Sequence, residues 1–429
     1  MIIAKYPGPR QVEALLQRPV INTEDLDATV CAILQKVKSG GDEALREYCL
    51  KFDKVNLSSL AVKPQETEEA ERLVAPQLKA AIGTAARNIE KFHARQREEF
   101  LPIETMPGVL CWRKSVPVQR VGLYIPGGTA PLFSTVLMLG IPARLAGCRE
   151  VTLCTPPGKD GKIHPAILYA AGVAGIRRIF KVGGAQAIAA LAYGTESAPK
   201  VDKIFGPGNR YVTCAKMLVQ KDGVAIDMPA GPSEVLVFAD GSCVPAFVAA
   251  DLLSQAEHDV DSQVVLLTTS AAVLDEVQRE VAAQSVNLPR QQILAKSLSH
   301  SVGILLKNET EAIEAINLYA PEHLILACKN AEAMAEKVVN AGSVFLGNFS
   351  PESAGDYASG TNHTLPTGGF ARSYSGVSLD SFLKKTTFQH ISPEGLEALA
   401  PAIMAMAEAE QLTAHARAVE VRLRKVEEV

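Results

Sequence analysis

The stretch VGLYIPGGTAPLFSTVLMLGIPARLAGCREVTLC (121–154) contains two short apolar runs, VGLYI (121–125) and EVTLC (150–154). Between them lies TVLMLGIPARLAG (135–147), which has the pattern of a buried helix. Short buried strands that alternate with helices are typical of a parallel α/β sheet. The stretch therefore predicts a strand, a helix and a second strand.

The first part of this stretch is also long and uncharged enough to raise the question of a membrane span. Pro126, Pro131 and Pro142 interrupt it, and they would leave backbone polar groups unpaired in lipid. We therefore expect no membrane segment.

The same alternation continues towards the C-terminus. Seven further apolar runs predict strands: RIFKV (178–182), KIF (203–205), EVLVF (234–238), QVVLL (263–267), VGILL (302–306), LILAC (324–328) and SVFLG (343–347). Nine strands are many for one sheet, so we expect two α/β units that meet near Asp227–Glu234. The strand signals stop after Leu379, and the apolar face of the tail predicts helices that pack on the core or on another subunit.

The first hundred residues have a helical pattern. Asn22 and Thr23 can cap a helix whose apolar positions repeat every 3.6 residues until Gly40-Gly41 ends it. A second helical stretch is predicted over 66–96.

Composition limits the classes of function. The 429 residues are 47% hydrophobic and 21% charged, and 43 Lys and Arg against 47 Asp and Glu leave a net charge of −4. This balance is typical of a globular protein and provides no basic surface for nucleic acid. The eight cysteines form no CxxC pair and the N-terminus has no apolar signal segment, so we expect mostly buried thiols in a cytoplasmic protein.

Three glycine-rich loops follow predicted strands: IPGGTAP (125–131), KVGGAQA (181–187) and FGPGN (205–209). Glycines between a strand and a helix let a phosphate or nucleotide approach the helix N-terminus. None of the loops matches GxGxxG or the P-loop, and each alone fits a plain turn. Together they favour a phosphate- or nucleotide-binding crevice without identifying the ligand.

A possible metal site involves residues from three segments. Gln255 and His258 are three apart in DLLSQAEHD and would share one helix face, while Asp356 and His363 lie in a loop of small residues and His415 lies in the tail. Two imidazoles, a carboxylate and an amide oxygen would suit Zn²⁺. A surface histidine beside a solvated aspartate explains the same spacing.

A possible acid–base pair precedes the strand LILAC. PEHL (321–324) places Glu322 and His323 side by side, and residues in a loop that enters a strand can converge. Glu-His is also a common surface dipeptide. DMPAGPSE (227–234), with Ser233, fits an ordinary turn equally well.

These segments together resemble the histidinol dehydrogenase family over essentially the whole chain. The resemblance rests on the following motifs: YIPGGTAPLFSTVLML, VGGAQAIAALAYGTE, KIFGPGN, DMPAGPSEVLV, DLLSQAEHD, YAPEHL, SPESAGDYASGTNHTLPT and AEAEQLTAHARAV. It implies an α/β fold with two incomplete Rossmann-like (doubly wound) domains, one inserted in the other. The implied parts are an N-terminal segment (1–20), a discontinuous catalytic and metal domain (21–120 and 235–378), an NAD-binding domain (121–234) and a helical dimerisation tail (379–429).

The resemblance also implies roles for individual residues. One Zn²⁺ per subunit would be bound by Gln255, His258, Asp356 and, from the partner chain of a homodimer with swapped tails, His415. NAD⁺ would contact Tyr124, Gln186 and Asn209. The residues implied to contact the substrate are Ser233, Gln255, His258, His323, Asp356, His363, Glu410 and His415.

The implied reaction is the zinc-dependent oxidation of L-histidinol through L-histidinal to L-histidine, the final step of histidine biosynthesis. It removes four electrons and so needs two NAD⁺, with Glu322 and His323 as the catalytic acid–base pair. Glu410 and His415 can reach one site only if the tail helix breaks between them, and Thr413 can cap a new helix there. Three alternatives remain open: a paralogue that oxidises another hydroxy compound, a metal-dependent hydrolase with Glu322 as base, and a non-catalytic binding protein.

Overall fold

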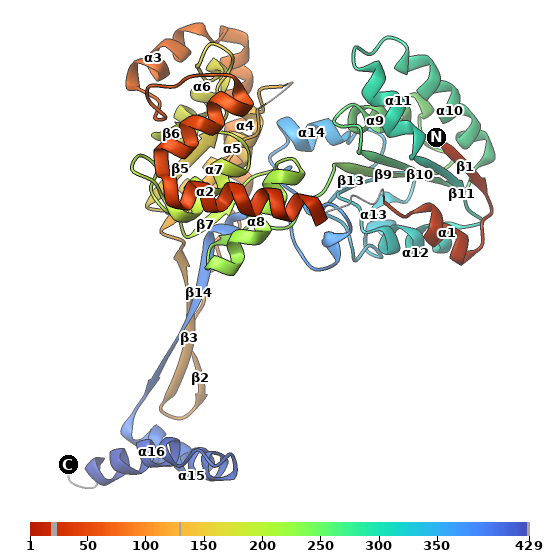
Figure 1. Cartoon of the computed structure of the whole chain (residues 1–429). Coiled ribbons are helices and arrows are strands. Elements are labelled where there is room, and N and C mark those ends of the chain that lie inside the picture. Colours follow the sequence, from red (N-terminus) through yellow and green to blue (C-terminus); the bar gives the residue numbers. More distant parts are fainter. Residues whose placement is uncertain (19–23, 128–129, 427–429) are drawn as a thin grey trace. The chain divides into compact units, whose positions relative to one another are not determined.

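The computed structural model describes residues 1–18, 24–127 and 130–426, which form two units (Figure 1). Unit 1 comprises Met1–Gln96 and Val118–Phe382, and unit 2 comprises Arg97–Pro117 and Leu383–Val429. The expected caps Asn22 and Thr23 lie outside the described residues, as do Gly128 and Thr129 of the first glycine-rich loop.

Unit 1 contains a six-stranded parallel sheet in the order β1-β11-β10-β9-β12-β13. Its strands are β1 (Ile2–Lys5), β9 (Glu234–Ala239), β10 (Gln263–Thr268), β11 (Val302–Leu305), β12 (His323–Ala327) and β13 (Ser343–Leu346). Helices cover both faces (Figure 1), because successive strand residues point to opposite sides: Val235 and Val237 share a core with one layer, and Leu236 and Phe238 with the other.

The helices of these two layers are as follows. The first layer contains α9 (Pro245–Ala256), α10 (Ala271–Ser285) and α11 (Gln291–Ser299), and the second contains α1 (Pro9–Leu15), α12 (Glu309–Tyr319) and α13 (Ala331–Ala335). The short helix α14 (Glu352–Tyr357) packs against α9.

Unit 1 also contains a five-stranded parallel sheet in the order β6-β5-β4-β7-β8. Its strands are β4 (Arg120–Tyr124), β5 (Glu150–Thr155), β6 (Arg178–Lys181), β7 (Lys203–Phe205) and β8 (Ala225–Ile226). In the five-stranded sheet β4 lies in the middle, with β5 and β6 on one side and β7 and β8 on the other. In the six-stranded sheet β9 has β10 and β11 on one side and β12 and β13 on the other, and β1 joins at the edge beside β11. This reversal of the strand order is the doubly wound topology. All nine predicted strands are present, and the two sheets divide between Ile226 and Glu234, as expected.

The helices of the five-stranded sheet come from two parts of the sequence. Four follow its strands: α5 (Phe133–Ala146), α6 (Pro165–Ala174), α7 (Gly184–Tyr193) and α8 (Arg210–Val219). Three precede them: α2 (Glu24–Tyr48), α3 (Pro64–Leu73) and α4 (Pro76–Ala94). The resemblance grouped residues 21–120 with the six-stranded sheet, whereas α2 shares a buried core with α7 and α8, and α3 and α4 pack on α6 and α5.

Two details of the early helices differ from the prediction. Gly41 has φ 50° and ψ −135°, so the glycine pair kinks α2 without ending it, and the helix continues to Tyr48. The stretch predicted as one helix over 66–96 is two helices, because Pro76 cannot continue the first and begins the second at its N1 position.

Unit 2 is built around an antiparallel sheet in the order β14-β3-β2, with β2 (Ile103–Met106), β3 (Val109–Pro117) and β14 (Leu383–Ile391). The expectation that strands stop after Leu379 is wrong for β14. Most of its side chains are exposed, so it lacks the apolar run that marks a buried strand. The helices α15 (Pro393–Ala409) and α16 (Thr413–Val426) follow and confirm the helical part of the tail.

Two further expectations concern chemistry and environment. Within the described residues, no helix combines the length and apolarity that a membrane crossing requires. All eight cysteines lie in the described ranges and are free thiols; four are buried, fewer than expected.

Candidate active site at the amino edge of the six-stranded sheet

Two neighbouring strands of the six-stranded sheet begin with chemically active residues. Glu234 is the first residue of β9 and His323 the first of β12, and His323 pairs in register with Val235. Ala320, at φ 52°, ends α12 in a left-handed conformation, and Pro321 and Glu322 then lead directly into the strand. The site therefore lies at the amino ends of the two strands.

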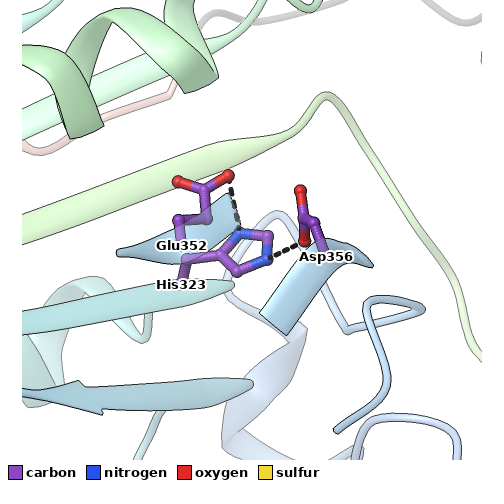
Figure 2. Close-up of side chains that lie close together, drawn as sticks. All are labelled: His323, Glu352 and Asp356. Carbon is purple, nitrogen blue, oxygen red and sulfur yellow. Dashed lines mark ion pairs between the residues drawn. The ribbon is translucent and has the colours of Figure 1, made fainter. Parts of the chain in front are cut away.

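The imidazole of His323 is surrounded by three carboxylates. Its Nδ1 lies 3.6 Å from Glu322 Oε2 and 3.9 Å from Glu352 Oε1, and its Nε2 lies 3.5 Å from Asp356 Oδ1. Figure 2 shows Glu352 and Asp356 on opposite edges of the ring. Glu322, His323 and Glu352 are all buried. The convergence of Glu322 and His323, which adjacent residues within a strand could not achieve, is confirmed.

Burial and mutual charge determine the acid–base properties of this group. Desolvation raises the pKa of Glu322 and of Glu352 to about 8. Desolvation alone would lower the pKa of His323, but the carboxylates of Glu352, Glu322 and Asp356 raise it to about 10. Burial acts against the ionised form of Asp356, yet its hydrogen bond and charge interaction with His323 lower its pKa. The site thus favours an ionised Asp356 and a strongly basic imidazole.

The main chain of β9 holds the acid–base pair in place. The Glu234 N–H donates to Glu322 Oε2 at 2.9 Å, and His323 Nδ1 lies 3.3 Å from the Glu234 carbonyl oxygen. The Glu234 carboxylate pairs with the Arg18 guanidinium at 2.5 and 2.7 Å, and Arg18 stacks on the ring of Tyr319 at 3.9 Å. Arg18 therefore neutralises Glu234, and Glu322, Glu352 and Asp356 are the carboxyl groups that act on His323.

The predicted metal ligands of unit 1 gather here. Gln255 is buried near the end of α9. Its amide nitrogen donates to the Glu352 carboxyl group, and its amide oxygen accepts from the Glu234 N–H at 2.9 Å. His258 follows within electrostatic reach of Asp356 and His323. In the described part of the chain, one group of three residues could hold a metal ion: His323, Glu352 and Asp356, whose ligand atoms lie within 4.8 Å of one another. It shares Asp356 with the predicted set.

Two predicted substrate residues also lie at this site. The Nδ1 of His363 lies 2.8 Å from the Asp356 carbonyl oxygen and donates to it, because a carbonyl oxygen only accepts hydrogen bonds. In the neutral imidazole the Nε2 atom then accepts from the Thr135 hydroxyl at 3.0 Å. Burial lowers the pKa of His363, consistent with this neutral form. Ser233 immediately precedes Glu234, and its carbonyl accepts from the Gln263 N–H.

The remaining predicted residues belong to unit 2. Glu410 is the C-cap residue that follows α15, His415 lies in the first turn of α16, and both are exposed. Gln411 between them has φ 59°, so the predicted break is confirmed, although Thr413 is the first residue of the new helix. The participation of Glu410 and His415 in the site stays a prediction.

The three predicted cofactor residues line one cavity of about 1300 Å³ at the carboxyl edge of the five-stranded sheet. The hydroxyl of Tyr124, the last residue of β4, accepts from the Gly184 N–H at 3.0 Å. The side chain of Asn209 caps α8 by accepting from the N–H groups of Tyr211 and Val212. Gln186 is buried in α7. Their common location supports the nucleotide-binding crevice predicted from the glycine-rich loops.

A buried ion pair holds the third glycine-rich loop. Lys216 and Asp227 pair with side chains 3% and 1% exposed. Lys216 also donates to the Gly206 carbonyl at 2.8 Å, and Asp227 accepts from the Gly206 N–H at 2.8 Å. Gly206 has φ 127°, and a β-carbon there would collide with the Tyr124 carbonyl. The loop that carries Asn209 is therefore fixed by the ion pair on one side and by the close approach of the Tyr124 carbonyl on the other.

The sequence reasoning missed three residues of these two regions: Glu352, Glu234 and Asp53. Glu352 lies four residues before Asp356, and this i, i+4 spacing on one helix could have found it. Glu234 had no such signal, because its partner Arg18 is 216 residues away in the sequence. Asp53, which lines the cavity, follows a helical pattern that predicts only packing.

Comparison with known proteins extends over nearly the whole chain. A family model described as histidinol dehydrogenase matches residues 16–423. The histidinol dehydrogenase of Bacteroides thetaiotaomicron is 61% identical over 423 residues, with 99% of each chain covered, and that of Salmonella typhimurium is 52% identical, with 98% of this chain and 97% of the relative covered.

A solved structure shows the same similarity in three dimensions. The crystal structure of histidinol dehydrogenase from Elizabethkingia anophelis matches with a TM-score of 0.98 and 56% identity, covering 100% of this chain and 99% of that one. With matches of this extent in both sequence and structure, the chain belongs to the histidinol dehydrogenase family.

Proposed function

We propose that the chain oxidises L-histidinol through L-histidinal to L-histidine with two NAD⁺, the final step of histidine biosynthesis, in the cytoplasm. Membership of the family supports the reaction, and one observation carries it: the buried Glu322–His323 pair, with Nδ1 and Oε2 3.6 Å apart, surrounded by further carboxylates. The neighbouring carboxyl groups raise the pKa of His323, and a cation that binds them would lower it again. The imidazole can then lose its proton and become the proton acceptor that hydride removal from an alcohol requires.

The electron and proton balance assigns the two residues different steps. In the first oxidation His323 takes the hydroxyl proton while a hydride leaves the alcohol carbon, and histidinal forms. Glu322 then takes a proton from the water that adds to the aldehyde, and His323 returns its proton to the aldehyde oxygen. His323 accepts the hydroxyl proton of the resulting hydrate as the second hydride leaves. NAD⁺, when bound in the cavity lined by Tyr124, Gln186 and Asn209, accepts each hydride.

The residues present fit one divalent cation per subunit. Glu322, Glu352 and Asp356 place carboxyl oxygens around a single imidazole, and these are donor atoms that a divalent cation binds. Burial disfavours the ionised forms of Glu322 and Glu352, and a bound cation would favour them. In our proposal Zn²⁺ is bound by Gln255, His258, Asp356 and His415 of the partner subunit. These residues supply an amide oxygen, two imidazoles and a carboxylate, which are ligands that suit this ion. Zn²⁺ there would supply positive charge that orients the amino alcohol through its nitrogen atoms.

The tail completes the proposed enzyme. Two chains exchange α15 and α16 in a homodimer, so that Glu410 and His415 of each tail serve the other subunit. Ser233, His363 and Glu410 contact the substrate beside the cation ligands, and Glu410 balances the charge of the substrate ammonium or imidazole.

The activity is tested by following NADH absorbance after L-histidinol is added to zinc-loaded protein with NAD⁺. We expect two NADH for each histidinol, and loss of activity with a chelator that zinc restores. Absence of NADH would reject the proposal. One NADH per histidinol would reject the second oxidation, and oxidation of another hydroxy compound in preference to histidinol would favour the paralogue. Light scattering that shows an active monomer would reject the exchange of tails.

A further inference from the structure

The cavity at the carboxyl edge of the five-stranded sheet includes a carboxylate that no predicted role explains. Asp53 ends a π-helical turn, η1 (Cys49–Asp53), which directly follows α2, and its side chain lines the cavity. Its Oδ2 is buried, and among the described residues it has no hydrogen-bond partner. The Cys49 thiol hydrogen-bonds the Asp53 carboxyl group and acts to lower its pKa, and Asp53 in turn acts to raise the pKa of the Tyr124 phenol.

An unpartnered buried carboxylate oxygen is unfavourable for the protein itself. Desolvation raises the pKa of Asp53 to about 6, so the group is still mainly ionised at neutral pH although burial disfavours this form. Buried polar atoms are nearly always hydrogen-bonded, and exceptions are typical of places where a ligand supplies the missing partner. The Oδ2 atom of Asp53 therefore indicates a hydrogen-bond donor on a bound molecule.

The surroundings restrict which donor this can be. Gly127 and Pro156 both line the cavity and lie so close together that a β-carbon on Gly127 would collide with Pro156, so bare backbone forms part of the wall. Lys51 and Lys159 line the cavity and are exposed, so phosphates would find positive charge there. A carboxylate only accepts hydrogen bonds, so it repels phosphate and selects hydroxyl or amine donors. In a dinucleotide the paired donors are the hydroxyl groups of a ribose.

The position of Asp53 selects one of the two riboses. Its neighbours Cys49 and Tyr124 belong to η1 and to β4 of the five-stranded sheet, whereas His323 begins a strand of the six-stranded sheet. The nicotinamide end has to reach the substrate, so the adenosine ribose is the one available to Asp53. Carboxylates that bind this ribose in doubly wound folds usually come from the sheet itself, about 20 residues after the glycine-rich turn. Here the carboxylate comes from a turn that precedes the sheet in sequence.

We infer that Asp53 accepts hydrogen bonds from the adenosine ribose hydroxyls of NAD⁺ and makes the enzyme prefer NAD⁺ to NADP⁺. A phosphate on the 2′-hydroxyl would replace the donor with negative charge beside the carboxylate. This inference rests on the proposed use of NAD⁺ and adds the residue that selects the dinucleotide.

The test compares Asp53→Asn with the matched control Asp160→Asn. Asp160 is an exposed carboxylate on the rim of the same cavity, which accepts from the Lys162 N–H at 3.1 Å. We expect D53N to raise the KM for NAD⁺ by about 10- to 100-fold, the usual effect of losing a hydrogen bond to a charged group. The preference for NAD⁺ over NADP⁺ in kcat/KM should fall at least tenfold, with the kcat at saturating NAD⁺ and the KM for histidinol within about twofold.

Three further measurements separate the possible outcomes. D160N should leave the KM for NAD⁺ within about twofold, and an equal rise in both variants would mean a general charge effect and overturn the inference. Nicotinamide hypoxanthine dinucleotide lacks the adenine amine; if D53N left the KM for this analogue unchanged, Asp53 would hold the amine and the inference would fail. D53N should unfold thermally no earlier than the wild type, so a lost affinity together with a lower melting temperature would mean a structural role.

Binding without turnover distinguishes this inference from the proposed function. Calorimetric titration with ADP-ribose measures the adenosine half alone, and D53N should bind it about 10- to 100-fold more weakly than the wild type. Wild-type protein that binds ADP-ribose through Asp53 but forms no NADH from histidinol would reject the proposed reaction and retain the inference. Protein that turns over histidinol with an unchanged KM for NAD⁺ in D53N would retain the reaction and reject the inference.

Discussion

The two sheets of unit 1 share one topology but place their functional residues at opposite edges. In the five-stranded sheet the glycine-rich loops follow the carboxyl ends of β4, β6 and β7, and they line a cavity of about 1300 Å³. In the six-stranded sheet the charged residues Glu234, Glu322 and His323 lie at the amino ends of β9 and β12. The first region has room and bare backbone, and the second is packed with titratable side chains.

This contrast separates two ways of building a site. Doubly wound sheets usually bind ligands outside the carboxyl ends of their strands, where the helix N-termini point. The cavity follows that rule, so its backbone can receive a nucleotide. The titratable group at the amino edge does not lie at the helix N-termini that follow the strands. Its chemistry depends on buried side chains that alter one another's pKa values. Substitutions at the amino edge should therefore lower kcat, whereas substitutions at the carboxyl edge should lower the stability of the protein or raise the KM for NAD⁺.

The largest effect is expected for His323→Asn at the amino edge. Loss of the proposed proton acceptor should lower kcat by about 10³-fold or more, while the KM for NAD⁺ and the zinc content stay within about twofold. Steady-state NADH formation and metal analysis measure these quantities. The control is His300→Asn, because the His300 imidazole lies 2.9 Å from the Ser262 carbonyl and has no role in the proposed reaction. Activity of H323N above a tenth of the wild type would contradict the assigned role.

The next largest effect is expected for Lys216→Met at the carboxyl edge. It leaves the carboxylate of Asp227 buried without its cation, which should lower the free energy of unfolding by about 3–5 kcal/mol. Urea unfolding measures the loss. The double variant K216M/D227N leaves no unpaired charge and should recover most of it. If the single and double variants were equally unstable, the ion pair would not be the cause.

A smaller effect is expected for Gly206→Ala, which tests whether the cavity needs bare backbone. Its β-carbon would meet the Tyr124 carbonyl at φ 127°, so we expect a loss of about 2–3 kcal/mol in the free energy of unfolding and a higher KM for NAD⁺. Gly223→Ala is the matched control: Gly223 also has positive φ, 85°, but no atom lies within 4 Å of the added carbon. It should lose only about 1 kcal/mol and keep its KM. Equal losses would show that conformation alone matters.

The smallest effect is expected in the pH dependence of Asp53→Asn. The folded-state pKa of Asp53 is raised to about 6 from an ordinary value of 3.8, so ionisation above pH 6 destabilises the wild type. D53N removes this cost and should be more stable by about 1–2 kcal/mol at pH 7–8, since solvent still reaches the half-buried side chain. The difference should shrink as the pH falls through 6 and vanish below about 4. Burial raises the pKa of the neighbours Cys49 and Tyr124 to about 12, so neither titrates in this range. A difference independent of pH would rule out this account.

The secondary structure of the buried sheets could be predicted because burial leaves a local pattern. All nine apolar runs are strands, and the change from β8 to β9 lies where the two units were expected to meet. The exposed strand β14 could not be found, since only an apolar run was available as a signal and its side chains mostly face solvent. The sequence also could not predict that α2, α3 and α4 pack with the helices of the five-stranded sheet. An amphipathic pattern shows that a helix has a partner surface, but it does not identify that surface.

Sequence alone determined the family, the short motifs and the residue types that can perform the chemistry, because all of these are local in the chain. Only the tertiary structure decided that Glu352 and Asp356 lie on either side of His323 and that Arg18 neutralises Glu234. It also decided that Asp53 has a buried oxygen with no hydrogen-bond partner among the residues that the structure describes. These relations join residues that are distant in sequence, and their energies depend on burial and on distances of a few ångströms. No local pattern records those two quantities.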